Sequence, residues 1–95
     1  MTFAEFMKLE RGDGVVIDGH TGTVTDITDH SQGSVLYEDG MKTTVLHSMR
    51  VVEISFFNEN TGKVEKLFPK IYTEHPDEVH NRSVLERLQV WNPFQ

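Results

Sequence analysis

The sequence contains no cysteine, only three prolines and a single tryptophan. The absence of cysteine excludes disulfide bonds and thiolate metal sites, so a zinc ion would have to be held by histidine and carboxylate side chains. No apolar run approaches the roughly 20 residues that a membrane-spanning helix needs. The first residues carry Glu5 where a signal peptide carries basic residues. We therefore expect a cytoplasmic protein with no membrane partner.

Basic residues are also scarce, because nine lysines and arginines stand against fifteen acids and give a net charge of −6. Residues 1–41 hold eight acids and two bases, which accounts for the whole −6, whereas residues 42–95 hold seven of each. An acidic surface repels nucleic-acid phosphates and favours basic partners. The acids either mark solvated turns or form a docking surface, and the sequence leaves both interpretations open.

Ninety-five residues with a hydrophobic fraction of 37% suffice for one small core, so we expect a single domain over residues 1–95. Thr2 and Glu5 have the spacing of a capping box, which predicts a helix over residues 3–10. Gly12 can end this element. We therefore assign residues 1–12 to an N-terminal helix.

After Gly12 the hydrophobic period changes to the alternation that is typical of strands. The polar stretch over residues 28–33 predicts a loop, Asp39-Gly40 predicts a tight hairpin turn, and residues 47–50 predict a short connection. Five short strands with these turn spacings indicate a small antiparallel barrel over residues 13–57. The predicted strands centre on residues 15–17, 23–27, 35–37, 43–46 and 51–54.

These segments read Gly-Asp-Gly-Val-Val-Ile-Asp-Gly, Thr-Gly-Thr-Val-Thr-Asp-Ile, Val-Leu-Tyr-Glu-Asp-Gly and Val-Val-Glu-Ile. Over residues 12–54 they resemble the SH3-like small barrels of the KOW and Tudor type, as found in small bacteriophage and bacterial proteins. The resemblance implies a barrel fold that binds RNA, peptides, modified side chains or proteins. The sequence departs from KOW-type nucleic-acid binders in being acidic. It departs from Tudor-type cages because Tyr37 is the one aromatic residue in this segment before Phe56.

Residues 58–95 predict an extended hairpin followed by a C-terminal helix. The turn cluster at residues 58–62 and the strand-like residues 63–68 form the second arm of this hairpin, which Pro69 ends. The helix has two possible starts, one at Pro76 and one at Ser83, where a second capping box is possible. Its apolar face would contain Val84, Leu85, Leu88 and Trp91, and Asn92-Pro93 would end it. The complete prediction is a mainly β fold with short flanking helices.

No residue pattern in the chain indicates catalysis. His20 and His30 have aspartates nearby in the sequence, but the five histidines lack a metal-binding spacing. The aspartates have polar neighbours that predict exposure, whereas acid–base catalysis needs buried carboxyl pairs. No serine lies in a nucleophile motif and no glycine-rich loop has the spacing of a phosphate-binding site. We predict no catalytic residue, metal ligand or cofactor.

The candidate binding residues fall into two groups. One consists of loop acids, and the other consists of aromatic side chains that can anchor an interface. Trp91 has an alternative interpretation, in which it packs on the barrel and completes the core. The acids are Asp18, Asp26, Asp29 and Asp39, and the aromatic residues are Tyr37, Phe57, Tyr72, Trp91 and Phe94.

The leading functional hypothesis is a non-enzymatic protein-binding module, such as a phage or mobile-element modulator that docks on a host protein with a basic surface. A KOW-like RNA- or DNA-binding module is the first alternative, and a small metal-dependent enzyme that uses the loop histidines and aspartates is the second. Self-association as a homodimer through open strand edges is compatible with each of these. The nucleic-acid hypothesis would use Lys42, Arg50, Lys63, Lys66 and Lys70.

Overall fold

The computed structural model describes residues 1–92, with only the backbone described at Val45 and Leu46. Its main feature is a curled antiparallel sheet that forms a half-barrel, so the predicted mainly β fold with short helices is confirmed. The strand order is β4-β3-β2-β1-β6, and β5 also pairs with β3. The elements are α1 (Phe3–Met7), β1 (Gly14–Ile17), β2 (His20–Glu38), β3 (Met41–Asn58), β4 (Lys63–Leu67), β5 (Lys70–Tyr72), α2 (Val79–Glu86) and β6 (Leu88–Val90).

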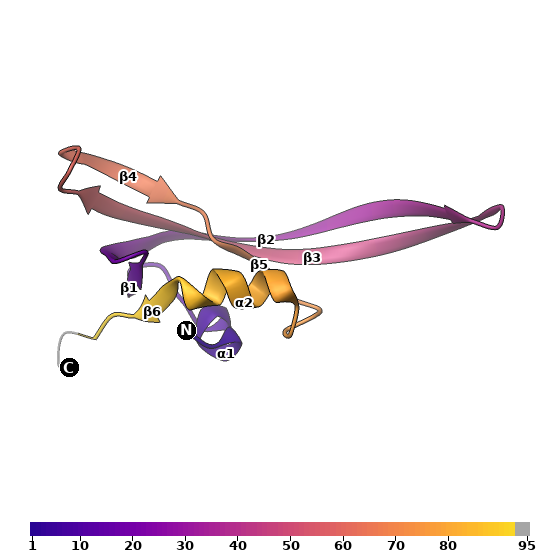
Figure 1. Ribbon diagram of the computed structural model, residues 1–95, viewed down its shortest axis with the longest axis horizontal. Helices are drawn as coiled ribbons and strands as arrows, with labels where there is room; N and C mark the ends of the chain where they lie inside the picture. The colour runs from indigo at the N-terminus through magenta and orange to yellow at the C-terminus, as the bar shows by residue number, and fades with distance from the viewer. Residues whose placement is uncertain (93–95) are drawn as a thin grey trace.

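The two long strands β2 and β3 form one hairpin that spans the molecule (Figure 1). Its turn is Asp39-Gly40, with φ angles of 53° and 74°, as predicted for a tight hairpin turn. The part of the hairpin over residues 31–48, which we call the arm, projects beyond the rest of the sheet and has no further strand at either edge within residues 1–92. The molecule therefore measures 56 × 27 × 21 Å. Its radius of gyration is 16.2 Å, against about 12 Å for a compact chain of this length.

The arm contradicts two sequence predictions. The predicted loop at 28–33 and the predicted connection at 47–50 are both wrong, because these segments are strand partners. Asp29 is opposite Arg50 and Ser31 is opposite Ser48 in an unbroken register that reaches Glu38 and Met41. Polar residues with low strand propensity are held in the ladder by their cross-strand neighbours, which outweigh local preference. The five short strands predicted for residues 13–57 therefore merge into three in the structure, which are β1 and the two long strands β2 and β3.

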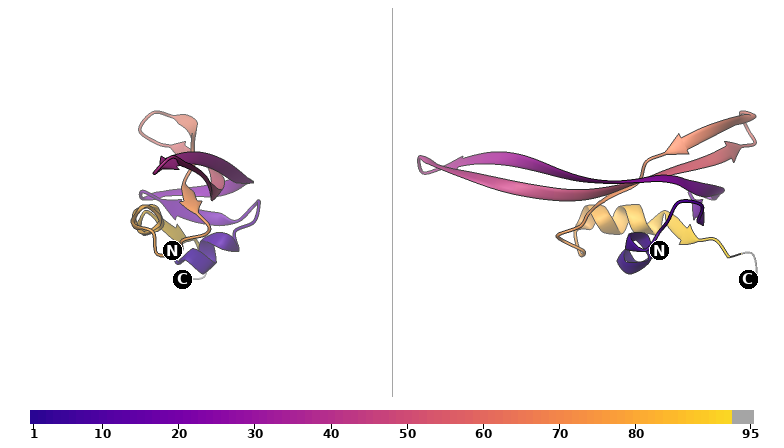
Figure 2. Two further views of the ribbon diagram at one scale, coloured as in Figure 1. Left: turned by 90° about the vertical axis from the view of Figure 1, so that its right-hand side faces the viewer. Right: turned by 180° about the vertical axis from the view of Figure 1, so that it is seen from behind.

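We call the part of the sheet outside the arm the sheet root. One face of the sheet root packs on both helices, as the views in Figures 1 and 2 show. The capping box predicted at Thr2 and Glu5 is present, with both of its hydrogen bonds formed. The helix it starts, α1, ends at Met7 and is thus shorter than predicted. Fully buried Phe6 anchors it to the core. The core also contains Leu9, Val15, Ile17, Val24, Val52, Ile54, Ile71, Val84, Leu85 and Leu88.

The edge of β3 opposite β2 is covered by β4 and then by β5, so the predicted hairpin around residues 58–62 is confirmed. Pro69 interrupts this edge strand without leaving the sheet, because its carbonyl accepts a hydrogen bond from the Val52 amide at 3.0 Å. Thr73 makes the last backbone hydrogen bond along the edge, where its amide donates to the Ser48 carbonyl at 2.9 Å. The chain then leaves the sheet for α2.

The C-terminal helix differs from both predicted versions. It begins after Glu78, with Ser83 inside it, and its last residue is Glu86. Leu88–Val90 then forms β6 and pairs with β1. The Trp91 amide extends this pairing by donating a hydrogen bond to the Gly14 carbonyl at 3.2 Å. The predicted helical face that included Leu88 and Trp91 is therefore wrong. Backbone pairing with the otherwise free edge of β1 satisfies polar groups of both strands.

The amide side chain of Asn81 joins α2 to the sheet and is fully buried. It accepts a hydrogen bond from the Tyr72 amide and donates to the Tyr72 carbonyl, both at 2.8 Å. It also donates to the His75 carbonyl at 3.0 Å. One side chain thus acts as a strand partner for the end of β5 and fixes the loop that connects β5 to α2.

We predict that Asn81→Ala lowers the free energy of unfolding by roughly 2–3 kcal/mol, because it leaves buried backbone groups unsatisfied. Urea unfolding followed by circular dichroism measures the change. The control is Ser83→Ala, which removes an exposed polar group from the same helix and should change stability by less than about 0.5 kcal/mol. Equal effects of the two substitutions would show that the Asn81 hydrogen bonds do not stabilise the fold.

Candidate functional site

The arm carries exposed apolar side chains near its tip. Tyr37 is 77% exposed and Met41 is 71% exposed, and Val35 and Leu36 are also largely open to solvent. Because side chains alternate along a strand, Val35 and Tyr37 lie on one face of the arm and Leu36 and Met41 on the other. Both faces of the ribbon therefore offer apolar contact area, and neither is covered within residues 1–92.

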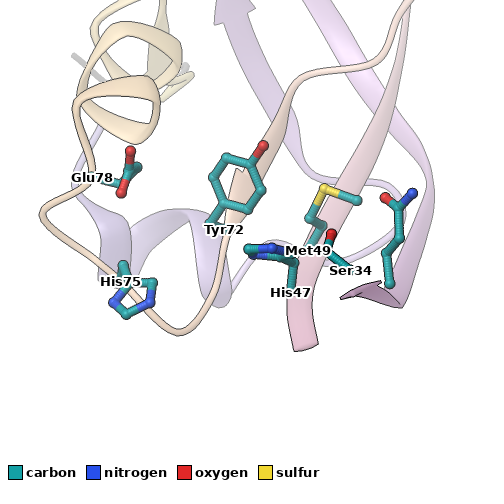
Figure 3. Close-up of a pocket in the computed structure, with 7 residues that line it drawn as sticks. Ser34, His47, Met49, Tyr72, His75 and Glu78 are labelled. Atoms are coloured by element: carbon teal, nitrogen blue, oxygen red, sulfur yellow. The ribbon is translucent and has the colours of Figure 1, made fainter. Parts of the chain in front are cut away.

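A groove of about 570 Å³ lies at the root of the arm. Figure 3 shows Tyr72 between the β5–α2 loop on one side and the arm on the other. The Tyr72 ring lies edge-on to His47, at a centroid distance of 6.4 Å, and to His80, at 5.3 Å. The lining residues are Gln32, Ser34, His47, Met49, Tyr72, His75 and Glu78.

The groove continues one face of the arm. Gln32 and Ser34 alternate with the residues of the opposite face and so share a face with Leu36. His47 and Met49 lie on the same face through their pairing with Gln32 and His30. A segment bound in the groove could therefore extend along this face toward Leu36 and Met41 at the tip.

The wall of the groove that the β5–α2 loop forms is rigidly attached to the sheet. Asn81 holds the backbone of Tyr72 and His75, as described above. In addition, the Ser48 hydroxyl donates to the Glu74 carboxylate at 3.0 Å, and the Thr73 hydroxyl donates to the Ser48 carbonyl at 3.3 Å. The loop that forms this wall is thus fixed before any ligand arrives, which lowers the entropic cost of binding.

The predicted acidic residues do not gather at one surface. Asp18 is in the β1–β2 turn, Asp39 is at the tip of the arm, and Asp26 and Asp29 lie within β2 rather than in a loop. Three of these four carboxylates have arginine partners. Asp18 accepts hydrogen bonds from Arg87 at 2.6 and 2.9 Å.

Asp29 makes a similar pair with Arg50, at 2.8 and 3.0 Å. The Arg50 guanidinium also donates to the Met7 carbonyl at 2.9 Å and so ties α1 to the start of the arm. Asp26 accepts from Arg11 at 2.7 Å and from the Ile27 amide at 2.9 Å. Asp39 forms no ion pair with any other residue in the range 1–92.

These hydrogen bonds favour the charged carboxylates. Donation by Arg87 lowers the pKa of Asp18, and donation by Arg50 lowers the pKa of Asp29. For Asp26, donation by Arg11 lowers the pKa most, followed by donation from the Ile27 amide. Within residues 1–92, three of the four predicted docking acids therefore serve intramolecular ion pairs as well as facing solvent.

The predicted aromatic residues are also dispersed. Tyr72 lines the groove, whereas Phe57 is exposed toward the other end of β3. Tyr72 pairs with Met49, and the eight residue steps from Met49 to Phe57 span about 26 Å of strand. Trp91 is 45% exposed and packs against Gly14, where an added Cβ would lie 2.8 Å from the indole ring. Phe94 lies outside the described residues.

Two of the histidines, His47 and His75, line the groove, but the histidines form no metal site in the described chain. No group of three or more histidine, aspartate or glutamate side chains within residues 1–92 is arranged to hold a metal ion. His20 instead stacks on Phe56 at a centroid distance of 4.6 Å. Lys66 pairs with Glu53 at 3.2 Å, and Arg50 is engaged by Asp29.

The sequence interpretation missed the groove-lining residues His47, Met49 and His75, and it missed Asn81. The sequence predicts a connection at residues 47–50, whereas His47 and Met49 follow the alternation of a strand. A buried asparagine has no sequence signature of its own, because its role depends on where the β5–α2 loop passes. Tyr72 is the one groove residue among the predicted binding residues.

Comparison with known proteins gives no match to any family model, curated protein or solved structure. None of the helices in residues 1–92 has the length and apolar character needed to cross a membrane.

We predict that acid weakens the fold through the aspartate–arginine pairs. A carboxyl whose pKa is lower in the folded than in the unfolded chain stabilises the fold above its ordinary pKa of 3.8. This stabilisation is lost as the pH falls through 3.8 toward the folded-state pKa. Urea midpoints measured between about pH 6 and pH 3 should therefore fall less in Asp29→Asn than in the wild type. Asp39→Asn, which removes an unpaired acid, should follow the wild-type curve, and equal slopes in all three proteins would contradict the prediction.

Proposed function

We propose that the protein is a non-enzymatic protein-binding module whose binding element is the arm together with the groove at its root. The observation that carries the proposal is the arm itself, a two-stranded ribbon with exposed apolar side chains on both faces. We retain the SH3-like assignment of the sheet root and the role of a phage or mobile-element modulator as parts of the same proposal.

The energetics of the arm support this proposal. A two-stranded ribbon is marginally stable by itself in water, because neither face is buried and both edges expose backbone groups. An arm that only filled space would be expected to carry polar side chains, whereas this one exposes Val35, Leu36, Tyr37 and Met41. A partner that covers these side chains would supply the missing burial, at roughly 25 cal/mol for each Å² of apolar surface removed from water.

The distribution of charge favours a mainly apolar contact with a minor electrostatic contribution. Asp18, Asp26 and Asp29 are neutralised locally by arginines, which leaves Glu38 and Asp39 as the acids at the tip of the arm. Glu78 adds an acid at the groove. A partner with basic residues around an apolar patch would match both features, and raising the salt concentration would weaken its binding only moderately.

A capture experiment tests the role of the arm. We expect the wild-type protein, immobilised and exposed to a lysate of its source or host cell, to retain a defined protein that the double variant Leu36→Ser, Tyr37→Ser does not retain. Truncation of interface anchors commonly costs 2 kcal/mol or more, which is about a thirtyfold loss of affinity. Mass spectrometry identifies the retained protein, and titration calorimetry with the purified partner measures the loss.

The matched control is Phe57→Ser, which removes an exposed aromatic side chain from β3 far from the arm. It should retain the partner. If Phe57→Ser abolishes capture and the arm variant does not, the binding surface is at the other end of the sheet. Retention of nucleic acid instead of protein, detected by a gel-shift assay at low salt, would favour the nucleic-acid alternative.

A further inference from the structure

The β2 edge of the arm has backbone groups free to pair with another strand. In a hairpin with a two-residue turn, the residues that flank the turn form a hydrogen-bonded pair, and the pairs then alternate. Glu38 and Met41 flank the turn, so the even-numbered residues of the arm in β2 bond to β3 and the odd-numbered ones face outward. Ser48 and Val52, the partners of Ser31 and Ile27, do face outward on β3, where they bond to Thr73 and Pro69.

The free part of this edge has defined limits. Near the sheet root, Gly12 and Asp13 bond to the backbone of Val24, and the outward amide of Ile27 is occupied by the Asp26 carboxylate at 2.9 Å. At the other end, the turn begins after Glu38. Between these limits, the outward residues with no backbone partner within residues 1–92 are Asp29, Ser31, Gly33, Val35 and Tyr37.

We propose that two copies of this chain associate through these edges, with β2 of one copy antiparallel to β2 of the other and Gly33 on the two-fold axis. In this register Ser31 of each copy faces Val35 of the other, and Asp29 faces Tyr37. All the free outward residues are then paired, which is the condition for a closed, two-fold symmetric contact. The two arms become the central strands of a continuous sheet.

The limits of the free edge select this register. If β2 of one copy were shifted by two residues toward the sheet root of the other, the tip of its arm would lie against Asp26. Arg11 already pairs with Asp26 there, at 2.7 Å. A shift in the other direction would leave outward backbone groups of Asp29 unpaired. In the proposed register each arm ends beside Ile27, the residue whose amide is already occupied.

The side chains along the edge are compatible with self-pairing. Proteins usually protect free edges with lysine, proline or a bulge, but β2 has none of these between Asp29 and Glu38. Asp29 is the only charged residue in the outward row; it is neutralised by Arg50 and would meet uncharged Tyr37, so no like charges face each other. Gly33 lies inside a strand, where glycine weakens an isolated ribbon and often marks the close approach of another backbone.

This contact goes beyond the proposed function and leaves room for it. The groove, Leu36 and Met41 lie on a face of the arm, and the β3 edge from Met41 to Leu46 faces the other direction. A dimer would thus present two grooves on one continuous sheet. If the chain is monomeric but still captures a protein partner, this inference fails and the proposed function stands. If the chain dimerises but captures no protein, this inference stands and the proposed function fails.

Sedimentation equilibrium over a wide concentration range tests the association. We expect the wild type to approach the mass of two chains as its concentration rises. Val35→Lys places a charge in the β2 edge and should raise the dimer dissociation constant more than tenfold. Thr44→Lys is the matched control, because Thr44 pairs with Val35 but faces the β3 edge, and it should dimerise like the wild type. A wild type that stays monomeric, or a loss of dimer in Thr44→Lys alone, would overturn the proposal.

Disulfide cross-linking tests the register independently of stability. The chain has no cysteine, so introduced thiols are the only ones present. In the proposed register Gln32 of one copy faces Ser34 of the other in a non-hydrogen-bonded pair, with Cα atoms about 4.5 Å apart, which is within disulfide range. An oxidised mixture of Gln32→Cys and Ser34→Cys chains should therefore give covalent heterodimers. A mixture of Gln32→Cys and Thr43→Cys should not, and equal yields in the two mixtures would contradict this register.

Discussion

The structure depends on one ladder, in which β2 and β3 pair from Gly22 and Phe56 to Glu38 and Met41. The root of this ladder supplies the core, because Val24, Val52 and Ile54 face both helices. Its far part supplies the arm, where the same backbone pairing continues without a core. A single hairpin thus combines a folded body with an exposed ribbon, and the stability of the ribbon depends on the register that the body fixes.

The change from body to arm is marked by the Asp29–Arg50 pair. Arg50 is mostly buried, and its guanidinium bonds both to Asp29 and to the Met7 carbonyl, so it joins β2, β3 and α1 at one point. On the opposite edge, Asn81 and Thr73 fix the end of β5 where the covered part of β3 stops. The Tyr72 ring against His47 and the hydrogen bond from Ser48 to Glu74 add to these contacts at the root of the arm. The position of the arm relative to the body is therefore set by strand twist and by contacts at its root.

Local features were predictable from the sequence where a few neighbouring residues determine the geometry. The capping box at Thr2, the Asp39-Gly40 turn and the hairpin around residues 58–62 are of this kind. The arm was not predictable in the same way, because residues 28–33 and 47–50 have the composition of turns and become strands only by facing each other. β6 escaped prediction for a related reason, since Val84, Leu85 and Leu88 do have helical spacing and only the free edge of β1 determines where the helix ends.

The candidate site was predicted less well than the fold, and the aspartates explain why. Their exposure was expected, but exposure does not show whether a carboxylate is available to a partner. Asp18 and Arg87 are 69 residues apart in the chain, and no local pattern indicates that they meet. The apolar side chains near the tip of the arm, together with Glu38 and Asp39, are instead among the side chains that remain exposed and outside the core. Binding is therefore better argued from the surface that the fold leaves unused than from the net charge of the chain.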